Sequence, residues 1–452
     1  MPQPKTPSPT YRWYMVGVFM VAYIFSFIDR QILSLLVEPI SEDLQIDDAQ
    51  FGLLLGAAFS LFYATMGIPV ARLADSANRP LILTLGIAVW SVCTAACGFA
   101  SSFWQMFLAR MGVGAGEGSL APTVYSMIAD SFPEDQLGRA YGVYSSGSMI
   151  GLGLAMIVGG AVAKFADSAG PLALPLIGLV KPWQLTFIVV GVPGILVALL
   201  IFTTIRDPQR KGMLAGRDGS AAKASIGATL TFITKEHPRT FFAFFFGNAC
   251  AGLSAFAVWL WSPAYFLRVF QMDTASVGLM LGLIFLIVNS AGSLVSGMLC
   301  DRFAAQGHLD APVRSGLIGA IGCIIPLGIL PFVPSLPLAA LVFAIAAFFS
   351  AFVVAASTAQ GQILAPNQMR GQVGALSLFV ISLIALGLGM WLIGYVTEAV
   401  FKDQLMVGHS MALVGCGFGA LGVALLLWGM SAYRRSRERI NVQLQGQGAA
   451  AE

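Results

Sequence analysis

Long apolar runs of about 20 residues alternate with short polar stretches along the whole 452-residue chain. A helix of that length spans the hydrocarbon core of a bilayer. Hydrophobic residues make up 57% of the chain and charged residues only 10%, against about 25% in a soluble domain. The pattern therefore predicts an all-α membrane protein with twelve transmembrane helices near 13–38, 50–71, 81–100, 103–127, 139–162, 183–204, 240–267, 275–299, 315–333, 337–362, 372–396 and 410–431.

Basic residues are distributed very unevenly among the connections between these helices. Of the 25 Lys and Arg residues, 19 fall in the termini and the alternate connections that share one side of the membrane. The first connection on the other side, 41–49, holds four acidic residues and no basic one. Because cytoplasmic loops carry an excess of Lys and Arg, we expect both termini to face the cytoplasm. Short outer loops without an Asn-x-Ser/Thr site favour a bacterial inner membrane, with an organellar membrane as the alternative.

The longest polar connection divides the chain into two halves of six predicted helices each. Residues of the second helix and its exit recur 226 positions later: Gly52, Gly56, Ala71 and Asp75 correspond to Gly278, Gly282, Gly297 and Asp301. Two parallel repeats with a binding site between them are typical of secondary transporters. We therefore predict two pseudo-symmetric six-helix bundles at 1–205 and 239–433, with a cytoplasmic linker at 206–238 and a cytoplasmic tail at 434–452.

Two acidic residues lie deep inside predicted helices, Asp29 in the first and Glu117 in the fourth. An ionisable group at the bilayer centre costs about 2.5–3.5 kcal/mol on insertion scales, so such residues are candidate functional sites. Glu117 and Arg110 are seven positions apart and share one helix face. Glu117 could form an interhelical ion pair that stabilises the bundle, or it could bind and release a proton. We favour proton coupling by Glu117 and Asp29, with no metal and no cofactor other than the proton.

Arg30 directly follows Asp29, so the two side chains diverge by about 100° around the helix. A guanidinium group binds phosphate or carboxylate through paired hydrogen bonds. Arg30, with Arg110 beside it, is therefore a candidate for binding an anionic headgroup; the alternative is that it only neutralises Asp29 or Glu117. The second half carries polar groups among large apolar residues, of which we select as substrate-binding candidates Asn248, Asn289, Ser357 and Gln360. A charged half and an apolar half together suit an amphiphilic substrate.

The connection after the second helix resembles a motif of the major facilitator superfamily, Gly-x-x-x-Asp-Arg-x-Gly-Arg. Residues 71–79 keep its acid, Asp75, and its final arginine, Arg79, but lack both glycines and the first arginine. The second copy keeps Asp301 and Arg302. Further motifs of this family are matched by the glycine-rich fourth and fifth helices. The resemblance implies the major facilitator fold.

The same resemblance implies a gate at the cytoplasmic helix ends. An acid beside the N-terminus of a helix gains roughly 0.3–1 kcal/mol from the helix dipole. We expect Asp75 to meet the helix that begins near Gly371, and Asp301 to meet the helix that begins near Arg139. The predicted gate residues are Asp75, Arg79, Arg139, Asp301, Arg302 and Gly371. A solvated loop acid is the alternative for each aspartate.

Within that superfamily, three segments resemble the Spinster family: Phe-Ile-Asp-Arg at 27–30, the glycine-rich segment 114–123, and Arg-Asp-Pro-Gln-Arg at 206–210. This resemblance implies proton-coupled transport of lysophospholipids or sphingoid-type lipids by alternating access. The alternatives are a carrier of a small organic anion, sugar or drug, and a non-transporting receptor of the same fold. We expect membrane lipids and an amphiphilic small molecule as partners, no nucleic acid, and a monomer.

The sequence argues against an enzyme or an ATP-driven pump. The three histidines, His237, His308 and His409, fall in loops or at helix ends, and no His-Glu-x-x-His motif is present. No Gly-x4-Gly-Lys-Ser/Thr phosphate loop occurs. Nothing resembles the selectivity filter or charged ring of a channel. We therefore predict a carrier rather than an enzyme.

Overall fold

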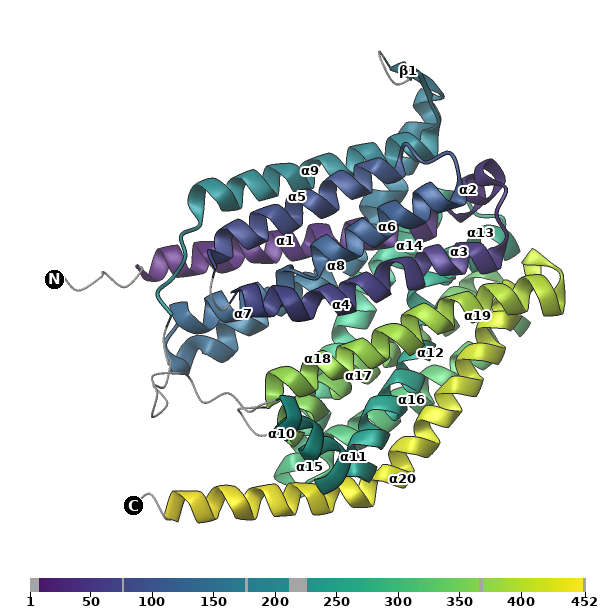
Figure 1. Cartoon of the computed structure of the whole chain (residues 1–452). Helices are drawn as coiled ribbons and strands as arrows, with labels where there is room; N and C mark the ends of the chain where they lie inside the picture. Colours follow the sequence, from purple (N-terminus) through teal and green to yellow (C-terminus); the bar gives the residue numbers. More distant parts are fainter. Residues whose placement is uncertain (1–7, 75–76, 175–177, 211–225, 366–368, 450–452) are drawn as a thin grey trace. The chain divides into compact units, whose positions relative to one another are not determined.

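The protein is described by a computed structural model that covers residues 8–74, 77–174, 178–210, 226–365 and 369–449 (Figure 1). Helices dominate these residues, and within them 11 helices are long and apolar enough to cross a membrane. The remaining predicted span, 103–127, is also helical but is divided into α6 (Phe103–Glu117) and α7 (Leu120–Ser131). The helical elements therefore correspond to all twelve predicted spans.

The chain forms two compact units, which we describe separately. Unit 1 consists of Met1–Ser220 and Pro263–Leu286, and unit 2 of Ala221–Ser262 and Ile287–Glu452. Unit 1 thus takes in a segment that the sequence repeat assigns to the second half. The predicted domain limits follow the repeat and stay a prediction.

In unit 1, α1 packs along α8 and α9, while α5 lies between α6 and α9 and α4 lies against α6 (Figure 1). Besides α6 and α7, its helices are α1 (Pro9–Leu35), α2 (Val37–Leu44), α3 (Asp48–Leu55), α4 (Ala57–Ala74), α5 (Arg79–Cys97), α8 (Glu134–Ala169), α9 (Pro182–Thr204), α13 (Ser262–Val269) and α14 (Thr274–Leu283). A short antiparallel hairpin of β1 (Leu172–Leu174) and β2 (Gly178–Val180) connects α8 to α9.

In unit 2, α16 packs against α17 and α20, and α12 packs against α17 and α20. The α-helices are α10 (Ile226–Thr231), α11 (Pro238–Phe242), α12 (Asn248–Leu260), α15 (Ser290–Ala305), α16 (Ala311–Ile329), α17 (Leu336–Leu364), α18 (Arg370–Ile381), α19 (Gly389–Tyr395) and α20 (Val407–Ala449). Short π or 3-10 segments join them: η1 (Phe232–Glu236), η2 (Ala243–Gly247), η4 (Leu330–Phe332), η5 (Ser382–Leu388), η6 (Val396–Phe401) and η7 (Gln404–Met406). A further π segment, η3 (Ile284–Asn289), connects α14 to α15 and includes residues of both units. The predicted linker thus contains α10 and η1, and α20 continues through most of the predicted tail.

Polar caps begin several helices where the apolar runs start. Asn78 accepts a hydrogen bond from the Leu81 N–H at 3.0 Å and begins α5. Asp47 accepts from the Gln50 N–H at 2.7 Å and begins α3. Such side chains satisfy the N–H groups that a first helical turn leaves unpaired.

Candidate functional site

Glu117, the last residue of α6, has a fully buried carboxyl group in unit 1. Its Oε2 accepts hydrogen bonds from Ser26 Oγ at 2.6 Å and from Arg30 Nη2 at 2.5 Å. Its Oε1 is buried and has no hydrogen-bond partner among the residues that the structure describes. One oxygen of this carboxyl group therefore bonds to two side chains of α1, while the other has no partner among the described residues.

Aromatic rings surround the guanidinium group of Arg30. Its Cζ lies 5.0 Å from the ring centroid of Phe27, 4.5 Å from that of Phe59 and 5.1 Å from that of Tyr63. Its Nε is buried without a hydrogen-bond partner in the described part of the chain. The cation is therefore held by rings on α1 and α4 as well as by Glu117.

Asp29 and Arg110 form the second half of the cluster, and both are buried. Arg110 Nη1 donates to the main-chain oxygen of Asp29 at 3.3 Å rather than to its carboxyl group. The Oδ1 of Asp29 and the Nε and Nη2 of Arg110 have no hydrogen-bond partner within the described ranges. Glu117 thus pairs with Arg30, not with Arg110 on its own helix face.

The four side chains sum to zero charge when all are ionised, because two carboxylates balance two guanidinium groups. Protonation of either acid leaves a net charge of +1 at a site shielded from water. An unpaired buried charge is strongly unfavourable.

Small residues allow the helix that carries Glu117 to approach its neighbours. A Cβ on Gly116 would lie 2.6 Å from the main-chain oxygen of Gly86 on α5, so only glycine fits there. The helix then ends at Glu117 with Gly118 as its C-cap, and Ser119 Oγ donates to the Gly116 carbonyl at 2.8 Å. The prediction of one continuous helix over 103–127 was therefore wrong in detail, because glycines weaken the helix next to Glu117.

The predicted gate residues occupy different environments. Arg79 is fully buried and donates to Asp207 Oδ1 at 2.7 Å and to Ser126 Oγ at 3.0 Å, with further bonds to Asp130 and the Pro208 carbonyl. These bonds tie the start of α5 to α7 and to the segment after α9.

The other predicted gate residues are exposed, apart from one that lies outside the residues the structure describes. Arg139 is exposed, with its Cζ 5.3 Å from the ring of Trp13. Asp301, Arg302 and Gly371 are exposed in unit 2. Asp75 lies outside the described residues. The gating role of these residues stays a prediction.

The polar candidates of unit 2 separate into two buried groups. Asn248 Nδ2 donates to Gln360 Oε1 at 2.9 Å. Asn289 Nδ2 instead donates to the Ala347 carbonyl at 2.8 Å and to Ser350 Oγ at 3.1 Å. Ser357 is buried. Their role in substrate binding stays a prediction.

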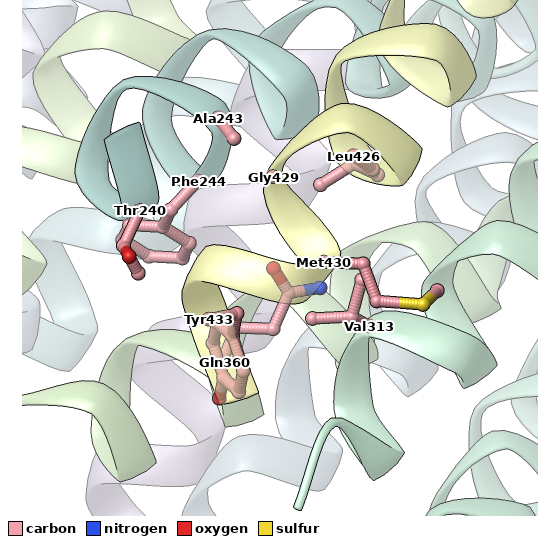
Figure 2. Close-up of a pocket in the computed structure, with 9 residues that line it drawn as sticks. All are labelled: Thr240, Ala243, Phe244, Val313, Gln360, Leu426, Gly429, Met430 and Tyr433. Atoms are coloured by element: carbon pink, nitrogen blue, oxygen red, sulfur yellow. The ribbon is translucent and has the colours of Figure 1, made fainter. Parts of the chain in front are cut away.

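Gln360 also lines a small cavity in unit 2 (Figure 2). The other lining residues are Thr240, Ala243, Phe244, Val313, Leu426, Gly429, Met430 and Tyr433. The enclosed space is only about 10 Å³, room for about one water molecule. Ligand pockets usually measure about 300–1,000 Å³, so in this conformation the cavity is too small for an amphiphile.

Sequence reasoning missed several partners. Ser26 lies one helical turn before Arg30, which places both side chains on one face of α1. This spacing could have predicted that Ser26 contacts Glu117 together with Arg30. It also missed the buried pair between Arg268 and Asp48, which are 220 residues apart. No local pattern signals that contact.

Three comparisons bear on what this arrangement does. The family description "Major Facilitator Superfamily" matches residues 19–386. A crystal structure of a bacterial homolog to the human lysosomal transporter Spinster, inward-facing and unoccupied, superposes with a TM-score of 0.76 and 25% identity over 96% of this chain and 98% of that chain.

Two curated relatives are also transporters. An MFS-type efflux pump of Mycolicibacterium smegmatis is 25% identical over 435 residues, which is 95% of each chain. A probable L-galactonate transporter of Escherichia coli is 29% identical over 307 residues, which is 67% of this chain and 63% of the relative. These matches confirm the predicted fold class and the resemblance to Spinster, and they agree with a protein that is not an enzyme.

Proposed function

The chain belongs to the Major Facilitator Superfamily, and we propose that it is a proton-coupled secondary transporter that moves an anionic amphiphile of lysophospholipid or sphingoid type by alternating access. The observation that carries this proposal is the buried Glu117 carboxyl group, with Oε2 bonded to Arg30 and Oε1 without a partner in the described chain. Ionisable groups in membrane-spanning helices are functional candidates by default.

Proton uptake and anion binding support each other in this proposal. A proton on Glu117 removes the negative charge that neutralises Arg30, and the guanidinium group then binds an anionic headgroup. Asp29, whose Oδ1 is also unpartnered among described atoms, is the second proton-coupling residue. A gradient of one pH unit supplies about 1.4 kcal/mol per proton, which biases a two-state carrier roughly tenfold.

The amphiphilic substrate is supported by the likeness to the Spinster homolog and by the contrast between the charged cluster of unit 1 and the aromatic core of unit 2. In that core Phe241, Phe244 and Phe245 are buried together. A small organic anion is the second candidate, since the Escherichia coli relative is a probable L-galactonate transporter. A guanidinium group binds carboxylate as well as phosphate.

We further propose a multi-pass protein of a bacterial inner membrane with both termini in the cytoplasm. The excess of Lys and Arg in one set of connections supports this orientation. We propose that it acts as a monomer, with protons as its coupling ion.

Uptake by the purified protein in proteoliposomes tests this function. Lysolipids, sphingoid phosphates, sugar acids and common drugs are each offered with and without a pH gradient. We expect uptake of an anionic amphiphile that the gradient accelerates, and loss of that acceleration in Glu117→Gln. The matched control is Glu438→Gln, which removes an exposed acid of α20. Binding without counterflow would identify a receptor and overturn the proposal.

A further inference from the structure

Three aromatic rings lie against the guanidinium group of Arg30, in addition to its ion pair with Glu117. Phe27 comes from α1, whereas Phe59 and Tyr63 come from α4, and the rings of Phe59 and Tyr63 stack at 5.3 Å with an interplanar angle of 21°. All three ring centroids lie within 5.1 Å of the guanidinium carbon. A cation over an aromatic face within about 6 Å is attracted by the ring quadrupole, most strongly where water is excluded.

Glu117 is not the only side chain that interacts with Arg30, since the Tyr63 hydroxyl is also within its electrostatic reach. Its Nη2 bonds to Glu117, while its buried Nε has no hydrogen-bond partner within the described residues. If Glu117 were the sole anchor, protonation of that carboxyl group would release a long, flexible side chain. A released arginine regains rotamer freedom, and a later anion would have to order it again.

We propose that Phe27, Phe59 and Tyr63 are positioning residues that hold the Arg30 guanidinium in place while Glu117 is protonated, so that it is already oriented for the substrate's anionic group. The role of these rings in substrate binding rests on the proposed function, whereas their contacts with Arg30 are a property of unit 1. Phe59 contributes most, because it is fully buried and also lies 5.7 Å from the Cζ of Arg110.

The inference can be tested without knowing the substrate, because rings shift the resonances of a cation held over their faces. The full chain is labelled with [15N]arginine in lipid nanodiscs, and the Nε–H resonance of Arg30 is assigned by its loss in Arg30→Lys. We expect this resonance to be shifted upfield in the wild type and to keep its shift in Glu117→Gln, which mimics the protonated acid. Return of the resonance to the ordinary arginine position in Glu117→Gln would overturn the inference.

Ring variants add a second readout. In the Glu117→Gln background, Phe59→Leu should abolish the upfield shift, Phe59→Trp should preserve it, and Tyr63→Leu should reduce it. The control is Phe187→Leu, which removes an equally buried ring of unit 1 that contacts Trp183 instead. An unchanged shift in both leucine variants would contradict the positioning role of these rings. If the shift survives in Glu117→Gln but a pH gradient does not accelerate uptake by the wild type, the proposed proton coupling fails and the positioning role stands.

Discussion

Arg268 and Asp48 form a bidentate ion pair, with Nη1 2.6 Å from Oδ2 and Nη2 2.8 Å from Oδ1. Their side chains are 4% and 0% exposed, and Arg268 Nε also donates to Glu38 at 2.6 Å. Asp48 stands in the first turn of α3, where the helix dipole favours an acid. Arg268 belongs to Pro263–Leu286, so the pair fastens this segment to the first half of the chain within unit 1.

Asp48→Asn should destabilise the protein strongly. Asp48→Asn leaves the buried Arg268 with only the partly exposed Glu38 as its partner. Breaking a buried ion pair costs about 3–5 kcal/mol, and the remaining contact with Glu38 offsets only part of this. We expect a marked fall in the melting temperature measured by nanoscale fluorimetry in detergent.

Glu38→Gln is the matched control for this pair. The Glu38 side chain is 36% exposed, and pairs near solvent are worth only about 0–1 kcal/mol. We expect a small change in melting temperature for Glu38→Gln, and partial recovery when Arg268→Leu is combined with Asp48→Leu. Equal losses for the Asp48→Asn and Glu38→Gln variants would contradict this account.

Arg79→Lys should weaken unit 1 although it keeps the charge. Arg79 bonds to Asp207, Ser126 and the Pro208 carbonyl from separate nitrogens, a fork that a lysine ammonium cannot reproduce. Hydrogen bonds to charged groups contribute about 1.5–3 kcal/mol each. We expect the free energy of unfolding of Arg79→Lys, measured with denaturant, to fall by at least the contribution of one such bond. Arg72→Lys, at an exposed position of α4, should change stability by no more than about 0.5 kcal/mol.

The apolar runs and the buried acids could be predicted from the sequence, because spanning length and the rarity of intramembrane charge are local properties. Glu117 and Arg30 do lie in contact. The choice of partner could not be predicted, since the rotation of α1 against α6 decides which side chain of α1 faces Glu117. It is also a tertiary contact that turns Asp48 from one of four acids in a predicted outer loop into a buried partner of Arg268.

Asp310 should contribute stability that depends on pH. It is buried between α15 and α16, where Oδ1 accepts from Arg314 at 3.0 Å and Oδ2 from Arg434 at 2.7 Å. Burial raises the pKa of this carboxyl group, but the hydrogen bonds from the two arginines outweigh it and hold the pKa below its usual range. Its contribution is therefore complete above the unfolded pKa of about 3.9 and is lost as pH falls through the lower folded value.

Asp310→Asn should accordingly lower the melting temperature at neutral pH, and the difference from the wild type should shrink below about pH 4. Asp301→Asn, which changes an exposed acid of α15, should have little effect on stability at either pH. A difference between wild type and Asp310→Asn that stays constant on acidification would show that the ionised form makes no contribution.

Gly278→Ala should disturb the seam between α8 and α14. A Cβ at Gly278 would lie 2.5 Å from the main-chain oxygen of Met156 and 2.9 Å from the Cα of Gly160. Main-chain atoms cannot move aside as a flexible side chain can, so the helices must separate, at a cost of about 1–3 kcal/mol. Gly142→Ala on α8 meets nothing within 4 Å and should stabilise the helix by about 0.5–1 kcal/mol. The melting temperature in detergent should therefore fall for Gly278→Ala and rise for Gly142→Ala. A shift in the same direction for both variants would show that close packing of α8 and α14 is not the reason for glycine at position 278.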